Sequence, residues 1–394
     1  MRKISASYIF PVNSPPVKQG ILIISDFGEI LDIVDTGENF KETASLEYYN
    51  GILVPGFVNA HCHIELSYMK GLMENSKGLP DFIRKILTNR TNIPENLEEI
   101  IKTADDEMKA EGIVAVGDIS NDDFSFGIKK SSSLYYHTFV EVFWPSPEKA
   151  GDVFGKGEFL FKKLKEYGLK ASMVPHAPYS MSPELFQMVH DHEIENRSIC
   201  SVHNQETISE NQLYQNHSGE LLDLFSNFGM DLSSIKATGK SSLQSILQYI
   251  PAELNALFVH NIFIGQTDVD AIKSALKKPF LILCPNSNLI IEQRLPDIEL
   301  FIKNNLILAI GTDSYSSNHR LSVLEELKTI TNYYPQIQLE KLIKWATLNG
   351  AMALGIDDNF GSFTKGKTPG VNLINGIDFE NMILTKESRV KRLV

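Results

Sequence analysis

The stretch "LVPGFVNAHCHIELS", from Leu53 to Ser67, leads an apolar, β-prone run into two histidines one residue apart. Side chains alternate between the two faces of a strand, so His61 and His63 share one face. Two imidazoles placed in this way can converge on one point. Glu65 follows them two residues later. The stretch therefore predicts a strand that ends in a pair of converging histidines.

Similar apolar, β-branched runs recur along the chain, and a stretch with helical spacing follows each. Examples of the helical stretches are "NLEEIIKTADDEMKAEG", "SPELFQMVHDHE", "TDVDAIKSALKK" and "RLSVLEELKTI", several of which begin with a Ser, Thr or Asp N-cap. Eight strand-then-helix units over roughly 300 residues predict an α/β fold, a (β/α)8 TIM-like barrel. A doubly wound open sheet is the alternative. The eight runs begin at Ile52, Ile113, Leu134, Ala171, Ser198, Asn255, Phe280 and Leu306.

The two ends of the chain follow a different pattern. The segments "GILIISDFGEILDIV" (20–34) and "GSFTKGKTPGVNLING" (361–376) alternate short β runs with glycine-centred turns. We expect residues 1–52 and 360–394 to form one small β-sandwich domain, and residues 53–359 to form the barrel. The longest insertion, 209–250, contains "GELLDLFSNFG", which reads as an amphipathic helix. Insertions on this side of a barrel often shape a substrate pocket.

Composition excludes several classes of protein. The chain has 394 residues, 43% of them apolar, and its net charge of −12 leaves no basic excess to neutralise a nucleic acid polymer. No apolar run approaches the roughly 20 residues that cross a bilayer, and Pro11 interrupts the start before a signal-peptide core can form. The sequence contains three cysteines and no CxxC pair. This pattern is typical of reduced, buried thiols, so we expect a cytoplasmic protein.

The positions of the histidines point to a site. Five of the ten histidines lie near the C-terminal ends of predicted strands, and Asp313 follows the eighth strand. In a barrel these ends form one mouth, where catalytic groups gather. The five are His61, His63, His176, His203 and His260. A second His-x-His pair, His190 and His192, lies near the end of a predicted helix, and we expect it to be solvated and unrelated to the mouth.

Two imidazoles from one strand, a third from another and one carboxylate form a ligand set that suits Zn²⁺ or Fe²⁺. Such an ion lowers the pKa of its bound water to about 7. Glu206 lies three residues after His203, where it can take a proton from water and pass it to the substrate. Spacing does not distinguish His260 from a ligand, and His260 could equally orient the water and polarise the substrate.

In these segments the chain resembles the amidohydrolase superfamily over essentially its whole length. The resemblance rests on "PGFVNAHCH", "HNQE", "VHN", "GTDS" and the terminal "GSFTKGK". It implies that His61, His63, His203 and Asp313 bind one divalent metal per chain, with Zn²⁺ expected and Fe²⁺ the alternative. It also implies that Glu206 shuttles protons and His260 assists the water. Binuclear relatives carry a lysine at the fourth strand, where this chain has "VPHAPYS", so a mononuclear site is implied.

The segments "HAPYS" and "CPNSN" resemble the aminohydrolase branch, which includes deaminases of S-adenosylhomocysteine, guanine and 6-aminodeoxyfutalosine as well as triazine chlorohydrolases. The stretch "HCHIELS" with Glu65 is most similar to the 6-aminodeoxyfutalosine deaminases. His176 would then contact the substrate. Glu141, at the end of the third strand, and Asn288, after the seventh, are further candidate substrate contacts on position alone.

We therefore expect a metal-dependent deaminase that releases ammonia from a purine-type base or nucleoside. The alternatives are a chlorohydrolase or cyclic amidase on the same metal site, and a non-catalytic binding barrel. The expected partner is a small molecule, with no nucleic acid polymer and no membrane. Homodimers are common in the superfamily, so the resemblance favours a homodimer, although the sequence itself does not choose an oligomeric state.

Overall fold

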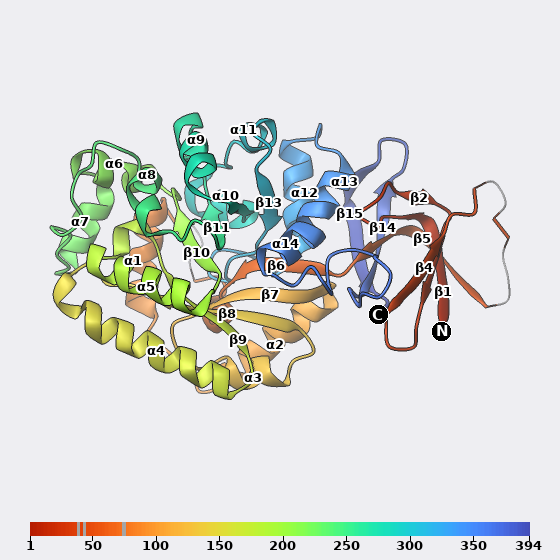
Figure 1. Ribbon diagram of the computed structural model, residues 1–394, viewed down its shortest axis with the longest axis horizontal. Helices are drawn as coiled ribbons and strands as arrows, with labels where there is room; N and C mark the ends of the chain where they lie inside the picture. Colours follow the sequence, from red (N-terminus) through yellow and green to blue (C-terminus); the bar gives the residue numbers. More distant parts are fainter. Residues whose placement is uncertain (38–39, 42–44, 73–75) are drawn as a thin grey trace.

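The structure is a computed structural model that describes residues 1–394 except 38–39, 42–44 and 73–75 (Figure 1). Its centre holds eight strands in two parallel four-stranded sheets. The first sheet contains, in order, β6 (Phe57–Cys62), β7 (Ile113–Ser120), β8 (Tyr135–Val142) and β9 (Lys170–Pro175). The second contains β10 (Cys200–Asn204), β11 (Asn255–His260), β12 (Lys278–Leu283) and β13 (Ile307–Ile310). All eight predicted strands are present.

The two sheets meet at two seams made of isolated hydrogen bonds. Between β9 and β10, the N–H of His203 donates to the carbonyl of His176 at 2.9 Å. Between β13 and β6, the N–H groups of Thr312 and Asp313 donate to the carbonyl of His61 at 3.0 and 3.1 Å. Strand order follows chain order in both sheets, without the reversal that defines a doubly wound sheet. The architecture is mixed α/β of the TIM-barrel type.

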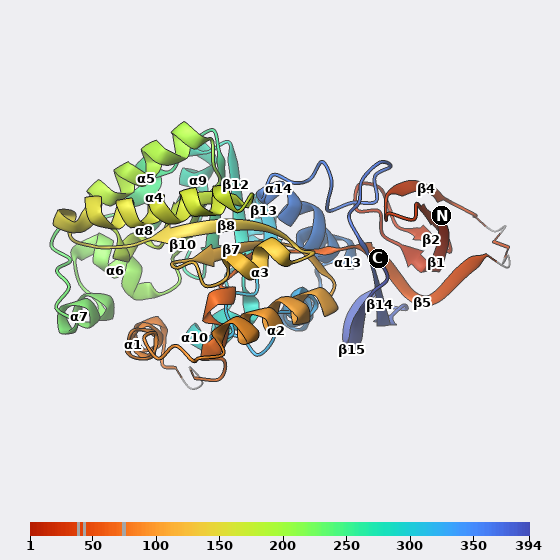
Figure 2. The same ribbon diagram turned by 90° about the horizontal axis from the view of Figure 1, so that it is seen from below.

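Helices alternate with the parallel strands and flank the sheets (Figures 1 and 2). The hydroxyls of Ser182 and Ser322 accept backbone N–H groups at helix starts, which confirms two of the predicted N-caps. The stretch that begins at Thr267 differs, because α9 begins at Gln266 and Gly265 is its N-cap. In the described residues, no helix is both long and apolar enough to span a membrane. The helices are α1 (Leu79–Asn89), α2 (Leu97–Ala110), α3 (Phe126–Ser131), α4 (Ala150–Glu166), α5 (Pro183–Asn196), α6 (Ile208–Asn216), α7 (Glu220–Asn227), α8 (Ser242–Ile246), α9 (Gln266–Ala275), α10 (Pro285–Glu292), α11 (Ile298–Lys303), α12 (Val323–Tyr333), α13 (Leu339–Lys344) and α14 (Gly350–Ala353).

Both chain ends pair in one seven-stranded sheet beside the parallel strands (Figure 2). The ends join where β14 runs antiparallel to β5, with Val371 opposite Pro55. A sheet built from both termini is thus observed, while its description as a β-sandwich stays a prediction. The strands are β1 (Arg2–Ile9), β2 (Val17–Lys18), β3 (Ile21–Ile24), β4 (Ile30–Val34), β5 (Leu46–Pro55), β14 (Val371–Asp378) and β15 (Ile383–Arg392).

The apolar run that begins at Ile52 was predicted as one strand, and the structure divides it. β5 ends at Pro55 in the terminal sheet, and β6 begins at Phe57 in the first parallel sheet. Gly56 makes this change of sheet possible, because a Cβ there would lie 2.3 Å from the Val114 side chain and 2.6 Å from the Pro369 carbonyl oxygen. The seventh run is also shorter than predicted, since Pro285 begins helix α10 rather than continuing β12.

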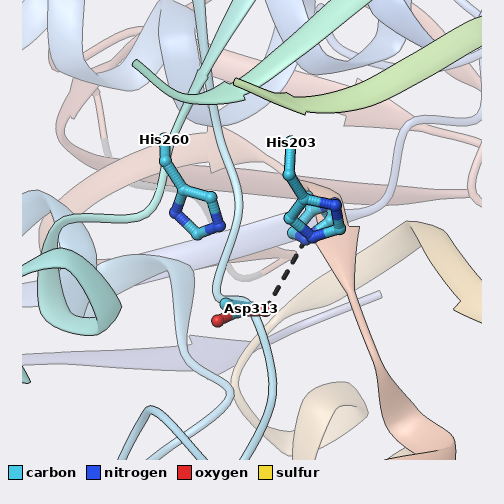
Figure 3. A group of neighbouring side chains, drawn as sticks. His203, His260 and Asp313 are labelled. Carbon is cyan, nitrogen blue, oxygen red and sulfur yellow. Dashed lines mark ion pairs between the residues drawn. The ribbon is translucent and has the colours of Figure 1, made fainter. Parts of the chain in front are cut away.

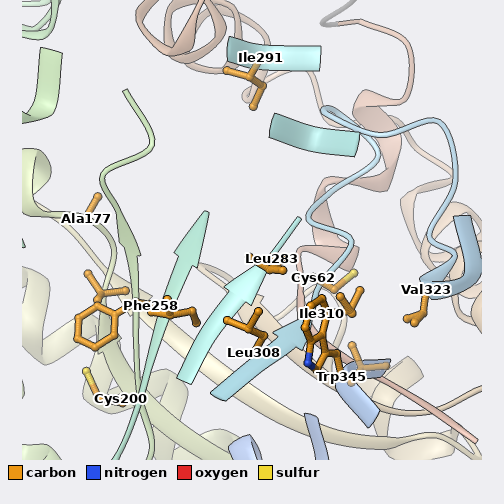
Figure 4. Close-up of a cluster of buried hydrophobic side chains, with 14 of the residues drawn as sticks. Cys62, Ala177, Cys200, Phe258, Leu283, Ile291, Leu308, Ile310, Val323 and Trp345 are labelled. Carbon is orange, nitrogen blue, oxygen red and sulfur yellow. The ribbon is translucent and has the colours of Figure 1, made fainter. Parts of the chain in front are cut away.

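The parallel strands pack against the surrounding helices through buried apolar side chains (Figure 4). Phe258, Leu283 and Ile310 of three neighbouring strands have no exposed surface. Cys62 and Cys200 belong to the same buried cluster, and all three cysteines are free and buried, as predicted. Fully burying each large apolar side chain stabilises the fold by about 1.5–3 kcal/mol, so this cluster anchors the strand ends that carry the site.

Candidate active site

Strand β6 delivers the two histidines of the first motif to one place. His61 lies near the end of β6 and His63 directly after it. Their Nε2 atoms are 3.1 Å apart, and the two rings meet edge to face. Both side chains are buried. The predicted convergence of the two imidazoles is therefore observed.

His203 reaches the same point from strand β10. Its Nε2 lies 3.4 Å from the Nε2 of His63. Its other ring nitrogen, Nδ1, lies 2.9 Å from the carbonyl oxygen of His176 and donates to it. A hydrogen bond at Nδ1 leaves the lone pair of Nε2 directed at the cluster, which is the usual arrangement of a metal-binding histidine.

Asp313 completes the cluster from the end of strand β13. Its Oδ1 is 3.3 Å from the Nε2 of His63 and 3.6 Å from that of His61. Its Oδ2 accepts hydrogen bonds from the hydroxyls of Ser287, at 2.7 Å, and Ser317. Figure 3 shows the rings of His203 and His260 pointing toward this carboxylate.

The donor atoms fit a divalent metal. A tetrahedral ion with bonds of about 2.1 Å holds its ligand atoms about 3.4 Å apart. The four separations given above for His61, His63, His203 and Asp313 run from 3.1 to 3.6 Å. A second set, in which His260 replaces His63, also lies within 4.8 Å. We assign His63 to the ligand set because its Nε2 lies 3.1, 3.4 and 3.3 Å from the donors of His61, His203 and Asp313. The ring centre of His63 is 4.8 Å from that of His61, whereas the ring centre of His260 is 6.0 Å from it.

The protonation states agree with a ligand role. Burial lowers the pKa of His63 and of His203 well below the ordinary value, so both rings stay neutral. Burial alone would raise the pKa of Asp313, but its hydrogen bond with His61 and its electrostatic interaction with the surrounding imidazoles hold it well below its usual range. His63 and His203 thus present neutral imidazoles and Asp313 an ionised carboxylate, the forms that bind zinc.

Glu206 and His260 lie beside the cluster. Glu206 follows β10, and its Oε1 is 3.6 Å from the Nε2 of His260. The opposite nitrogen of that ring, Nδ1, lies 2.8 Å from the Oδ1 of Asn288. Burial raises the pKa of the Glu206 carboxyl well above its usual range, which suits a group that exchanges a proton near neutral pH.

The backbone at these strand ends takes an uncommon conformation. Non-glycine residues with positive φ occur at the ends of three of the strands or within three residues of them, at Gln205 (φ 44°), His260 (φ 72°), Asn261 (φ 61°) and Asp313 (φ 56°). A positive φ at a non-glycine residue costs free energy, so this conformation persists only where the surrounding structure enforces it. Such positions occur most often at functional sites. Four such residues at one edge of the sheets support a functional role for this edge.

A cavity that opens to solvent lies over the cluster, and its empty space together with the open solvent at its mouth amounts to about 950 Å³. His63, His203, Glu206, His260 and Asp313 form its polar end. The remainder is mainly apolar. Phe225 and Met230 of the 209–250 insertion contribute to the lining, as an insertion that shapes the pocket was expected to do. Within the insertion, α7 buries Leu221, Leu224 and Phe225 and is the amphipathic helix predicted from "GELLDLFSNFG".

The structure separates the four predicted substrate contacts into two pairs. His176 and Glu141 line the cavity. Glu65 does not; its carboxylate accepts hydrogen bonds from the backbone N–H groups of Asn121, at 3.0 Å, and Asp122, at 3.4 Å. Asn288 lies behind His260 and is likewise absent from the lining. Neither Glu65 nor Asn288 lines the cavity as it stands in this structure, so their predicted contact with substrate stays a prediction.

The second His-x-His pair lies outside the site, as predicted, but one part of that prediction was wrong. His190 and His192 belong to α5, and the Nδ1 of His190 lies 2.9 Å from the Tyr249 carbonyl oxygen. His192 is 7% exposed and packs edge-on against Phe161, so it is not solvated. The ring of His192 packs between α5 and α4. The position of His192 near a helix end does not reveal this contact, because the contact depends on how the two helices pack.

Two cavity residues were missed in the sequence. Arg90 follows helix α1, and Asn121 is the first residue after β7. The position of Asn121 directly after a predicted strand was a usable signal, because the other site residues share it. The sequence contains no comparable signal for Arg90. This residue lies at the end of a helix, and the direction of its side chain depends on how that helix packs.

Comparison with known proteins places these features in a family. The sequence profile of the amidohydrolase family matches residues 52–390. The chain is 29% identical over 90% of its length to "Adenosine deaminase" of Helicobacter pylori, covering 88% of that protein. It is 28% identical over 89% of its length to "Aminodeoxyfutalosine deaminase" of Nitratiruptor sp., covering 86%.

A solved structure also matches. The crystal structure of Helicobacter pylori aminofutalosine deaminase, in complex with methylthio-coformycin, superposes with a TM-score of 0.80 at 26% identity, over 95% of this chain and 92% of that one. The family profile covers most of the chain and includes every residue of the cluster. This protein belongs to the amidohydrolase family.

Proposed function

We propose that this chain is a metal-dependent hydrolytic deaminase that releases ammonia from an adenosine-type nucleoside. The observation that carries the proposal is the position of Glu206 and His260 directly beside His61, His63, His203 and Asp313 at one end of a cavity. Family membership supports a hydrolase acting on carbon–nitrogen bonds, and relatives at 28–29% identity bear the names of deaminases.

The three imidazoles and the carboxylate would hold one divalent ion, for which Zn²⁺ is the first choice because the set combines nitrogen and oxygen donors. When bound, the ion supplies an activated water at neutral pH. Asp313 carries the compensating negative charge, and the hydroxyls of Ser287 and Ser317 hold its second oxygen in place. This support leaves the first oxygen free to face the histidines.

Glu206 is the proton carrier of the proposal. Its raised pKa lets it accept a proton from the attacking water and donate it to a ring nitrogen of the substrate. His260 orients the water and stabilises the charge that develops on the substrate, since its ring is fixed by Asn288 at the opposite nitrogen. Ammonia then leaves from the ring carbon that water has attacked.

The polar groups of the cavity favour a nucleoside over a free base. Glu141 is 6% exposed, and its Oε1 has no hydrogen-bond partner within the described structure. A buried acceptor of this kind costs free energy until a ligand supplies a donor. His176 lies beside it, and both residues are next to His203 of the cluster. Sugar hydroxyls of a nucleoside whose base lies at the cluster would supply the donors.

Ammonia release from a panel of substrates tests the proposal. We expect zinc-loaded protein to deaminate at least one of adenosine, 5'-methylthioadenosine, S-adenosylhomocysteine and 6-aminodeoxyfutalosine, with guanine as the free-base comparison. The E206Q variant, with equal metal content, serves as the matched control. Inactivity toward all five compounds at full metal occupancy would contradict the proposal. Release of chloride from a chlorotriazine without any ammonia release would favour a chlorohydrolase instead.

A further inference from the structure

Glu206 lies on a short turn, residues 205–207, between strand β10 and helix α6. Within the described part of the chain, no hydrogen bond holds its carboxylate, whose Oε1 lies 3.6 Å from the Nε2 of His260. The direction of this side chain therefore depends on the backbone that carries it. Gln205, directly before Glu206, has a φ of 44°, so this backbone needs support from the surrounding structure.

Glu210, in the first turn of α6, supplies part of that support. Its Oε1 accepts the backbone N–H of Gln205 at 2.8 Å, and its Oε2 accepts that of Glu206 at 3.4 Å. A glutamate at the third helical position ordinarily reaches back to the N–H of the N-cap residue, here Thr207. Glu210 instead reaches the two residues before the N-cap. Its side chain is fully buried, so water cannot take its place as an acceptor.

The far end of the 209–250 insertion closes on Glu210. The hydroxyl of Ser242, 32 positions further along the chain, donates to the Oε1 of Glu210 at 2.6 Å. The backbone N–H of Ser242 donates at 3.0 Å to the Oδ1 of Asn211, which also accepts the side-chain amide of Gln205 at 3.0 Å. The two ends of the insertion are thus tied to each other and to the turn 205–207.

A second buried carboxylate joins the same network to the helix that follows β11. The Oδ2 of Asp268, on α9, accepts the side-chain amide of Gln205 at 3.2 Å. Its Oδ1 accepts the amide of Gln244, near the end of the insertion, at 2.8 Å. Strand β11 ends at His260. The segments that carry Glu206 and His260 therefore share one buried network.

We propose that Glu210 is a positioning residue for Glu206, and that the return of the insertion at Ser242 holds Glu210 in place. The proposal rests on the proposed function, because that function makes Glu206 the proton carrier. Phe225 and Met230 of the same insertion line the cavity, so the segment that shapes the pocket also fixes the group that moves the proton. Glu210 does not line the cavity and takes no part in the chemical step.

The E210Q variant tests the contact. In either orientation of the new amide, its NH2 group faces one of the two backbone N–H groups that Glu210 accepts, so a hydrogen bond is lost while the size is kept. For the best substrate of the panel, we expect kcat to fall by about 10- to 100-fold, with KM within about threefold and the zinc content unchanged. Hydrogen exchange, measured residue by residue, should become faster at the backbone amides of Gln205 and Glu206.

Combination with E206Q shows whether Glu210 acts through Glu206. If it does, E206Q/E210Q should turn over at the rate of E206Q alone, because no proton carrier remains to be positioned. S242A should lower kcat in the same way by about 3- to 10-fold, since it removes one hydrogen bond to Glu210. S226A is its control, because the Ser226 hydroxyl donates to the Leu222 carbonyl of its own helix at 2.8 Å, and it should match the wild type.

The matched control for E210Q is D105N. Asp105 is a buried carboxylate outside the cavity lining, and it accepts the hydroxyls of Ser132 at 2.7 Å and Tyr136 at 2.8 Å. D105N therefore also removes a buried acceptor, but far from the turn 205–207. It should keep kcat within about twofold of the wild type and leave the exchange of the two turn amides unchanged.

Three results would overturn the proposal and separate it from the proposed function. A kcat of E210Q within about twofold of an active wild type would refute the positioning role while leaving the deaminase intact. If E210Q lowers kcat by the same factor in the E206Q background as in the wild type, Glu210 only supports the fold. If the wild type deaminates none of the compounds, the proposed function fails, and unchanged exchange of the two turn amides in E210Q would then refute the Glu210 contact as well.

Discussion

The backbone N–H of Asp313 donates to the carbonyl oxygen of His61 at 3.1 Å, which joins the last parallel strand to the first. The neighbouring Thr312 N–H donates to the same oxygen at 3.0 Å, and its hydroxyl accepts from the side-chain amide of Asn59 at 2.7 Å. These bonds fix the register across the seam. They place a carboxylate from one end of the chain against imidazoles from the other.

Removal of a histidine of the cluster should release the metal. We expect H61A to bind Zn²⁺ more than about 100-fold more weakly than the wild type, because even the outer contacts of metal sites are commonly worth 10- to 100-fold. Metal content after dialysis against a chelator of known affinity measures this. H190A, from the other His-x-His pair, should retain its metal. Equal metal content in H61A and wild type would show that the cluster is not a metal site.

Glu206 should matter for turnover and not for metal binding. We expect E206Q to lower kcat by about 10²- to 10⁴-fold, the usual contribution of a general acid or base, while the zinc content stays at the wild-type value. Gln keeps the size and the polarity of the side chain but cannot carry the proton. Steady-state kinetics beside metal analysis check this. A kcat within twofold of wild type would remove Glu206 from the proton-transfer role.

The Asn288 amide should act through His260. Because the Oδ1 of Asn288 lies 2.8 Å from the Nδ1 of His260, N288A should free the imidazole to rotate and reduce kcat by about 10- to 100-fold. N288D restores an acceptor at this position and should recover part of the activity. Its pH–rate profile should be shifted, because a carboxylate raises the pKa of the imidazole it contacts. Loss of activity in N288D equal to that in N288A would point to a packing role.

Glu193 should make the stability of the fold depend on pH. Burial raises the pKa of this carboxyl, on α5 beside Cys200, well above the ordinary value of 4.5. Above pH 4.5 the unfolded chain loses this proton while the folded chain keeps it, so stability falls as the pH rises until the folded-state pKa is passed. E193Q removes this dependence.

Urea unfolding of E193Q and wild type at a series of pH values measures the effect. The free energy of unfolding of E193Q relative to wild type should increase from pH 4.5 upward. The exposed Glu195 on the same helix gives the control, E195Q, which should follow the wild type at every pH. A difference between E193Q and wild type that stays constant with pH would show that Glu193 is ionised in the folded protein.

The eight strands, the alternating helices and the candidate ligands were accessible from the sequence. Apolar, β-branched runs and helical spacing are local properties, and they located β7 over its full length, Ile113–Ser120. A parallel arrangement brings the ends of all strands to one edge, so position after a strand was enough to find His61, His203 and Asp313. The division of the first run at Gly56 was not accessible, because it depends on contacts with Val114 and Pro369.

What the sequence by itself determined is therefore the set of strands and the residues at their ends, since short-range periodicity encodes both. Only the tertiary structure decided what each polar residue faces. It turned Glu65 toward the N–H groups of Asn121 and Asp122, directed Asn288 at His260, and brought Arg90 to the cavity from the end of a helix. The direction of a side chain depends on contacts between segments distant in sequence, and these contacts exist only once the sheets and helices have packed.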